Sequence, residues 1–131
     1  MAKMIHSMIR VKDLAGSIKF YHELFGFEVR RTIEFDNFSL TYLGDRESHF
    51  ELELTHNFTN TAPYQLGNGY GHLALCSNNI EFLWQKAKMQ GYQPSEIKSL
   101  NQQNQLVAKF FFVTDPDGYQ LEVIERNHIF N

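Results

Sequence analysis

The sequence has one cysteine, no run of basic residues and no long apolar stretch. The single Cys76 excludes an internal disulfide and suits a reducing compartment. With 12 Lys and Arg against 15 Asp and Glu, the charge favours neither nucleic acid nor an anionic membrane as a partner. No apolar run approaches the roughly 18 residues of a membrane span, and residues 1–7 lack the apolar core of a secretion signal. We therefore expect a cytoplasmic protein that binds neither nucleic acid nor membrane.

The composition is typical of a chain that packs a core. Hydrophobic residues make up 43% of the 131 residues, and 12 of the residues are Phe. This content is enough for a folded core, so we predict one domain over residues 1–131.

The pattern of the first half predicts a strand over residues 4–11 and a helix that follows. Asp13 is a good N-cap, and Gly26 is a typical stop after Phe25. Three strand-like segments come next, at residues 27–34, 38–43 and 49–55.

The same order of elements returns after a polar linker at residues 58–69. A strand over residues 71–77 precedes a helix with a capping-box start at Asn78 and Glu81 and an end at Gly91. Strands are expected at residues 92–100, 106–114 and 119–126, with a polar loop or hairpin tip at 99–105. The fold class is therefore α+β, with two tandem βαβββ modules at about residues 4–57 and 70–127.

Each module opens with a histidine on its first strand and carries a glutamate on its last. His6 and Glu53 are 47 residues apart, and His72 and Glu122 are 50 residues apart. Glu122 follows the turn Asp115-Pro-Asp-Gly118 and shares a strand face with Ile124. Taken singly, each of these residues is more typical of a core or a surface. The repeated pair is much less expected by chance.

Two histidines and two glutamates are a plausible ligand set for a divalent transition metal. Imidazole nitrogen suits Zn, Ni, Co and Fe, and the two carboxylates balance the charge of the ion. Water can fill the remaining positions and leave room for a substrate.

Four segments resemble the short bacterial form of glyoxalase I (lactoylglutathione lyase), a family of the vicinal-oxygen-chelate superfamily. The resemblance covers nearly the whole chain and rests on His6-Ser-Met-Ile-Arg-Val11, Glu53-Leu-Thr-His-Asn57, Gly71-His-Leu-Ala-Leu75 and Asp115-Pro-Asp-Gly-Tyr-Gln-Leu-Glu122. The resemblance implies cupped mixed sheets and a homodimer in which each site lies between the first half of one chain and the second half of the other.

The same resemblance implies a metal site formed by His6, Glu53, His72 and Glu122, which match the family's four ligands. Ni(II) or Co(II) is favoured, and Zn(II) is possible. The implied reaction is the isomerisation of the methylglyoxal–glutathione hemithioacetal to S-lactoylglutathione through an enediolate, which detoxifies methylglyoxal. Glu122 matches the usual base, and Glu53 either shares this role or stays a ligand.

Two further positions match glutathione contacts of the family. Arg10 lies four residues after His6 and Asn57 four residues after Glu53, roughly 13 Å along a strand. A guanidinium and an amide at that distance suit the polar ends of an extended tripeptide.

One segment departs from the family pattern. Relatives carry a Lys and glycines before the Asp-Pro-Asp-Gly turn, where this chain has Asn101-Gln-Gln-Asn-Gln105, so Lys98 or Lys109 would have to substitute. Two alternatives therefore stay open. One is another metalloenzyme of the superfamily, an epimerase or a dioxygenase, and the other is a metal-free resistance protein that sequesters a small molecule.

Overall fold

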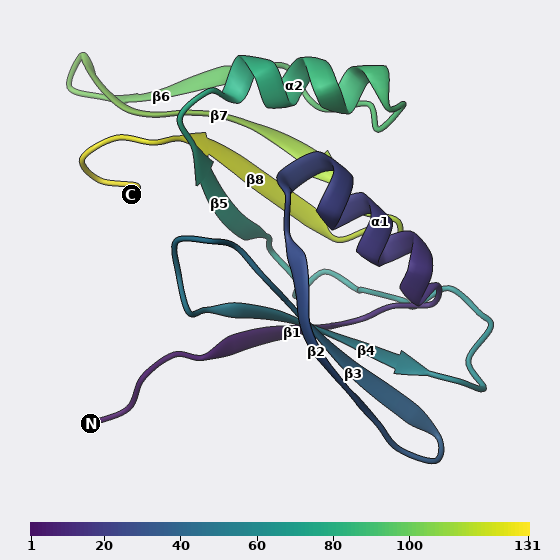
Figure 1. Cartoon of the computed structure of the whole chain (residues 1–131). Coiled ribbons are helices and arrows are strands. Elements are labelled where there is room, and N and C mark those ends of the chain that lie inside the picture. The colour runs from purple at the N-terminus through teal and green to yellow at the C-terminus, as the bar shows by residue number, and fades with distance from the viewer. The chain divides into compact units, whose positions relative to one another are not determined.

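The computed structural model describes all 131 residues, which divide into two compact units, Met1–Gln65 and Leu66–Asn131. In Figure 1 the first unit runs from purple to teal and the second from teal to yellow. Each unit contains one helix and one four-stranded sheet.

The first unit begins with β1 (His6–Arg10) and α1 (Leu14–Phe25), followed by β2 (Glu28–Glu34), β3 (Phe38–Gly44) and β4 (Glu51–Asn57). The order across its sheet is β1-β4-β3-β2. β1 is parallel to β4, whereas β3 is antiparallel to both β2 and β4.

The second unit repeats this plan with β5 (Leu73–Ser77), α2 (Ile80–Met89), β6 (Lys98–Gln102), β7 (Gln105–Thr114) and β8 (Gln120–Glu125). Its sheet order is β5-β8-β7-β6, and β5 is parallel to β8. The predicted fold class, α+β with two tandem βαβββ modules and mixed sheets, is confirmed.

The first helix has the ends that its sequence predicts. The carboxylate of Asp13 accepts a hydrogen bond from the Gly16 N–H at 3.1 Å. Gly26 closes the helix in the left-handed region at φ 75°, and its N–H donates to the His22 carbonyl. Such a φ is cheap only for a residue without a Cβ, which explains why the helix stops there.

The second helix starts one residue later than predicted. Asn79, and not Asn78, is the N-cap, and its side chain accepts a hydrogen bond from the Phe82 N–H at 3.1 Å. Phe82 is the N3 residue of a helix that begins at Ile80, so this hydrogen bond satisfies one of the free N–H groups of the first turn.

The strand predicted at residues 92–100 was wrong at its start, because β6 begins only at Lys98. Gln93 has φ 51°, and Pro94 follows it, so the chain cannot enter a regular ladder there. Ser95 ties this segment down instead, because its N–H donates to the Phe112 carbonyl and its hydroxyl accepts from the Phe112 N–H.

The polar stretch at 99–105 is a hairpin tip and mostly strand. β6 continues to Gln102 and β7 starts at Gln105, so only Gln103 and Asn104 form the turn. Both have positive φ, at 50° and 63°, which is the backbone of the tightest hairpin turns.

Neither helix of the protein has the length and apolar surface needed to cross a bilayer.

Candidate metal centre

The first predicted pair of ligands comes together within the first unit. The His6 Nε2 lies 2.8 Å from a carboxylate oxygen of Glu53. β1 and β4 are parallel with Met8 opposite Glu53, so His6 points to the same face as its partner. Glu53 is buried, whereas about a third of the His6 side chain, 34%, is exposed.

The second predicted pair repeats this geometry in the second unit. The His72 Nε2 lies 2.8 Å from a carboxylate oxygen of Glu122. Ala74 stands opposite Glu122, as Met8 stands opposite Glu53. Each histidine therefore lies two residues before the residue that faces its glutamate. The structure therefore gives each half of the chain the same two side chains in the same relation.

Each pair presents one imidazole nitrogen and one carboxylate oxygen side by side, which is a suitable half set of donors for a divalent transition metal. Neither unit by itself gathers three or more His, Cys, Asp or Glu side chains that could hold an ion.

The two pairs differ in the ring that lies against each histidine. Tyr42 on β3 stands opposite Glu53, and its ring meets the His6 ring edge to face at 5.8 Å. Phe112 on β7 stands opposite Glu122 and meets the His72 ring in the same way at 5.5 Å. The first pair therefore has a phenol beside it where the second has a plain phenyl ring.

Tyr42 interacts with charged groups on both sides. Burial raises the pKa of the Tyr42 phenol, and the charge of Glu53 opposite it raises this pKa further. The guanidinium of Arg31 lies over the ring, with its carbon 4.1 Å from the centroid. Sequence analysis missed Tyr42, because only the register of β3 against β4 places it beside Glu53.

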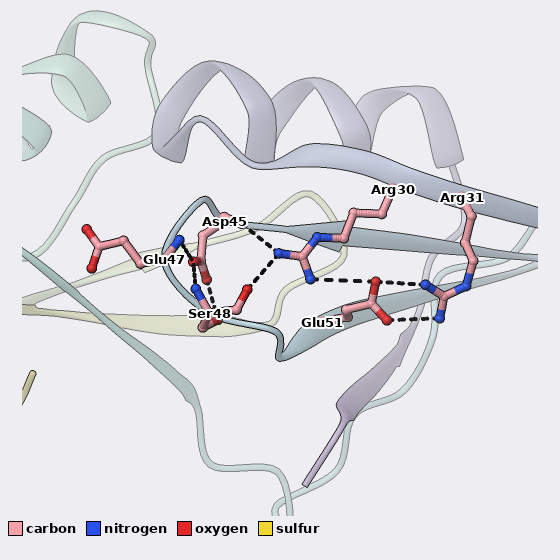
Figure 2. A network of polar contacts seen from close by, with 6 residues as sticks. All are labelled: Arg30, Arg31, Asp45, Glu47, Ser48 and Glu51. Carbon is pink, nitrogen blue, oxygen red and sulfur yellow. Dashed lines mark hydrogen bonds and ion pairs between the residues drawn. The ribbon is translucent and has the colours of Figure 1, made fainter.

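A network of charged residues supports the Arg31 side chain, and Figure 2 shows its members. The two terminal nitrogens of Arg31 donate to the two carboxylate oxygens of Glu51, each at 2.9 Å. This bond to Arg31 holds the pKa of the Glu51 carboxyl below its usual range. Gln120 takes the equivalent position in the second unit, two residues before Glu122, so the network belongs to the first unit.

Arg30 joins this network to the turn between β3 and β4. One of its nitrogens donates to the backbone carbonyls of Asp45 and Ser48, at 2.6 and 2.8 Å. The Asp45 carboxylate in turn accepts the N–H groups of Glu47 and Ser48, both at 2.7 Å, and the Ser48 hydroxyl at 2.8 Å. Asp45 thus organises the turn that leads into β4.

The contribution of Asp45 to stability should depend on pH. Burial alone would raise the pKa of this carboxyl, but the hydrogen bonds from Ser48 and Glu47 and the charge of Arg30 place the pKa below its ordinary value of 3.8. A carboxyl whose pKa is lowered by folding stabilises the fold above that ordinary value, and this stabilisation is lost as the pH falls through the lowered pKa.

We therefore expect Asp45→Asn to lower the midpoint of thermal unfolding at neutral pH and to have a smaller effect in strong acid, where Asp45 is itself protonated. Thermal melts of both proteins at several pH values would measure this difference. Because Asn keeps an acceptor oxygen in the turn, a gap between the two midpoints that stays constant down to the lowest pH would contradict the assigned role of the charge.

The two predicted substrate contacts lie on the face of the first pair. Arg10 ends β1 opposite Thr55, and Asn57 ends β4. The amide of Asn57 donates to the Tyr64 hydroxyl at 3.2 Å, so part of its hydrogen-bonding capacity is already used. Their roles in binding a substrate stay predictions.

Two repeated mixed-sheet units, each with a His–Glu pair on or next to its two parallel strands, define the class of this protein. The family model described as the Glyoxalase/Bleomycin resistance protein/Dioxygenase superfamily matches residues 3–123. The chain belongs to this superfamily.

Comparisons with individual proteins point to one branch of the superfamily. The chain is 36% identical to the lactoylglutathione lyase of Haemophilus influenzae over 129 residues, covering 95% of this chain and 93% of that protein. It is 32% identical to the enzyme of the same name from Neisseria meningitidis, covering 95% and 91%.

Solved structures agree with these sequence relatives. Leishmania major glyoxalase I, described as trypanothione-dependent, matches with a TM-score of 0.74 and 35% identity, over 95% of this chain and 87% of that one. Glyoxalase I from Zea mays matches with a TM-score of 0.83 and 30% identity, over 95% of this chain and 44% of that one. The resemblance to glyoxalase I that the sequence predicts is confirmed.

Proposed function

We propose that this protein is a lactoylglutathione lyase, which isomerises the hemithioacetal of methylglyoxal and glutathione to S-lactoylglutathione and so detoxifies methylglyoxal. The observation that carries the proposal is the repeated His–Glu pair, with 2.8 Å between nitrogen and oxygen in both units. The bacterial relatives named lactoylglutathione lyase, which this chain matches along more than nine-tenths of their length, support the choice of reaction.

The proposed ligands of one divalent metal are His6, Glu53, His72 and Glu122. Two neutral imidazoles and two carboxylates balance the charge of such an ion, and we favour Ni(II) or Co(II), with Zn(II) as the other choice. When bound, the metal would stabilise the negative charge that develops on the substrate oxygens.

The assembly that we propose is a homodimer in which each site takes the His6–Glu53 pair from one chain and the His72–Glu122 pair from the other. Exposed apolar side chains on and before β1, namely Met4, Ile5 and Met8, support an interface next to the first pair. We place this dimer in the cytoplasm, in keeping with the single Cys76.

The reaction needs a group that moves a proton from the carbon beside the carbonyl to the neighbouring carbon. Glu122 is the proposed base for both steps, since a carboxylate next to the reacting carbons can accept the proton and return it. Glu53 is its counterpart in the first unit. Arg10 and Asn57 are proposed to bind the polar ends of glutathione, and their side chains would orient it along β1 and β4.

The choice of glutathione rests on the bacterial relatives, since the Leishmania relative of similar identity is described as trypanothione-dependent. The hairpin tip at residues 103–104 carries no cation, and Lys109 is occupied by ion pairs to Glu81 and Glu125. The glycine carboxylate of glutathione would therefore need a different partner, and Lys98, exposed at the start of β6, is the other lysine near the hairpin tip in the sequence.

The test is a thioester assay on protein freed of metal with a chelator. Methylglyoxal and glutathione are added, followed by Ni(II), Co(II) or Zn(II) in turn, and thioester absorbance is recorded. We expect no turnover without metal and recovery with one of the three ions. Trypanothione in place of glutathione is the matched control for the thiol. Protein that binds metal but forms thioester with neither thiol would overturn the proposed reaction while leaving the metal site standing.

A further inference from the structure

The two histidines of the proposed site each lie against an aromatic ring, but different forces hold the two rings. The His6 ring meets the Tyr42 ring at 5.8 Å, with 72° between the planes. The His72 ring meets the Phe112 ring at 5.5 Å, with 71° between the planes. The carboxylate contact of each histidine, at 2.8 Å, fixes one nitrogen but leaves the imidazole able to turn about the line between nitrogen and oxygen. The neighbouring ring therefore sets the plane of the imidazole.

In the first unit a guanidinium covers the ring that contacts His6. Arg31 on β2 stands opposite Tyr42 on β3, and its guanidinium carbon lies 4.1 Å from the centroid of the ring. A planar cation at this distance is attracted by the negative face of the ring and also packs against it. Tyr42 is buried, so the guanidinium and the imidazole together confine its ring.

Arg31 needs a partner to keep this position, because its side chain is 51% exposed on the outer strand of the sheet. A long side chain at such a place has many rotamers available. Glu51 is that partner, since both terminal nitrogens of Arg31 donate to its two carboxylate oxygens at 2.9 Å (Figure 2). A bidentate bond fixes the plane of the guanidinium as well as its position. Glu51 is itself buried on β4, directly opposite His6.

The second unit holds its ring by apolar packing. Phe112 contacts the Phe110 ring at 5.8 Å. β6 begins at Lys98, which pairs with Phe110, so β6 has no residue opposite Phe112. Gln120 stands where the first unit has Glu51, two residues before the glutamate of the pair. An ion pair thus supports the ring beside the first histidine alone.

We propose that Arg31, held by Glu51, is a positioning residue that fixes the Tyr42 ring and, through this ring, the orientation of the His6 imidazole toward a metal ion. This role depends on the proposed metal site. It concerns metal binding alone, so it can be tested without any substrate.

The direction of the expected effect separates positioning from charge. By charge alone, removal of a cation near a metal site strengthens the binding of a divalent ion. Loss of a neighbour that orients a ligand weakens the binding, by about 10- to 100-fold in other metal sites. Arg31→Ala should therefore weaken metal binding, against the direction that its lost charge would produce.

The main test removes both members of the ion pair, as Arg31→Ala with Glu51→Gln, so that the net charge does not change. The matched control is Arg46→Ala with Glu28→Gln, which removes a largely exposed pair of the same unit, 3.2 Å apart. Competition with a chelator measures the affinity for Ni(II) and Co(II), and the visible spectrum of the Co(II) protein reports the arrangement of its ligands. We expect binding about 10-fold weaker and an altered spectrum in the first double variant, and wild-type values in the control.

Changes at Tyr42 test the contact between Arg31 and His6. Tyr42→Phe keeps the ring and should leave metal affinity within about twofold of the wild type, whereas Tyr42→Leu should weaken it by about 10-fold. Adding Tyr42→Leu to the variant without the ion pair should cost little more, because both changes act on the same imidazole. Arg31→Lys keeps the charge but not the planar fork, and its affinity should fall between those of the wild type and Arg31→Ala.

Thermal melts establish that each variant is folded. A folded variant without the Arg31–Glu51 pair that keeps wild-type affinity and the wild-type Co(II) spectrum would overturn the positioning role. Equal losses in this variant and in its control, or tighter binding by Arg31→Ala, would overturn it as well. If the wild type binds metal but forms no thioester, the proposed reaction fails by itself, and the affinities still decide the role of Arg31.

Discussion

Glu122→Gln is expected to lower the rate of thioester formation by about 10²- to 10⁴-fold, which is the range that a positioned acid–base group contributes. The amide has nearly the shape of the carboxylate but cannot accept the proton from the substrate carbon. The Glu122 side chain is 17% exposed and its contact is to His72, so the fold should survive the change. Initial rates at saturating metal, together with thermal melts, would measure both effects.

Glu125→Gln is the matched control, because Glu125 lies on the same strand but points to the opposite face, toward Lys109 at 3.6 Å. Its rate should stay close to that of the wild type. Substantial residual turnover in folded Glu122→Gln with metal bound would show that another group moves the proton, and Glu53 would be the first candidate.

Each of the changes His6→Ala and His72→Ala is expected to lower the affinity for Ni(II) or Co(II) by more than about 100-fold. Loss of a direct ligand should cost more than loss of an outer partner, for which 10- to 100-fold is usual. The two effects should be similar in size, because both histidines meet their glutamate at the same distance, 2.8 Å. Chelator competition on the purified variants would measure the affinities.

His56→Ala serves as the control for these two variants. His56 lies on β4 near Glu53, but it points to the opposite face, and its ring contacts Phe58 at 5.4 Å. Its metal affinity should match that of the wild type. If only one of the changes at His6 and His72 weakened binding, the proposed equality of the two pairs would be contradicted.

The repeat of elements and the two His–Glu pairs were predictable from the sequence because they depend on local signals. Asp13 and Gly26 mark the ends of α1, and the matched spacing of each His and Glu shows which residues correspond in the two halves. Because successive side chains of a strand point to opposite faces, each His and its Glu can be assigned to one face of the sheet. This is enough to expect them to meet once the strands are paired.

The surroundings of the pairs were not predictable in the same way. Tyr42 and Arg31 reach Glu53 only through the registers of β2 on β3 and of β3 on β4, and the first of these shifts at an irregularity between Val29 and Arg31. A shift of one residue would turn all these side chains to the other face. The alternation of residues along the sequence does not show where such a shift occurs. The late start of β6 has a similar origin, since the positive φ of Gln93 is a property of the folded chain.

The place of β2 in its sheet gives Arg30 and Arg31 a second role. β2 is the outer strand of the first sheet and is exposed along its whole length, so one row of its backbone groups lacks a partner strand. Unprotected rows of this kind recruit other chains and start aggregation, and charged side chains along the edge oppose such pairing. The charges of Glu28, Arg30, Arg31 and Glu34 protect this edge, so the arginines that support the proposed site also help to keep the protein dispersed at high concentration.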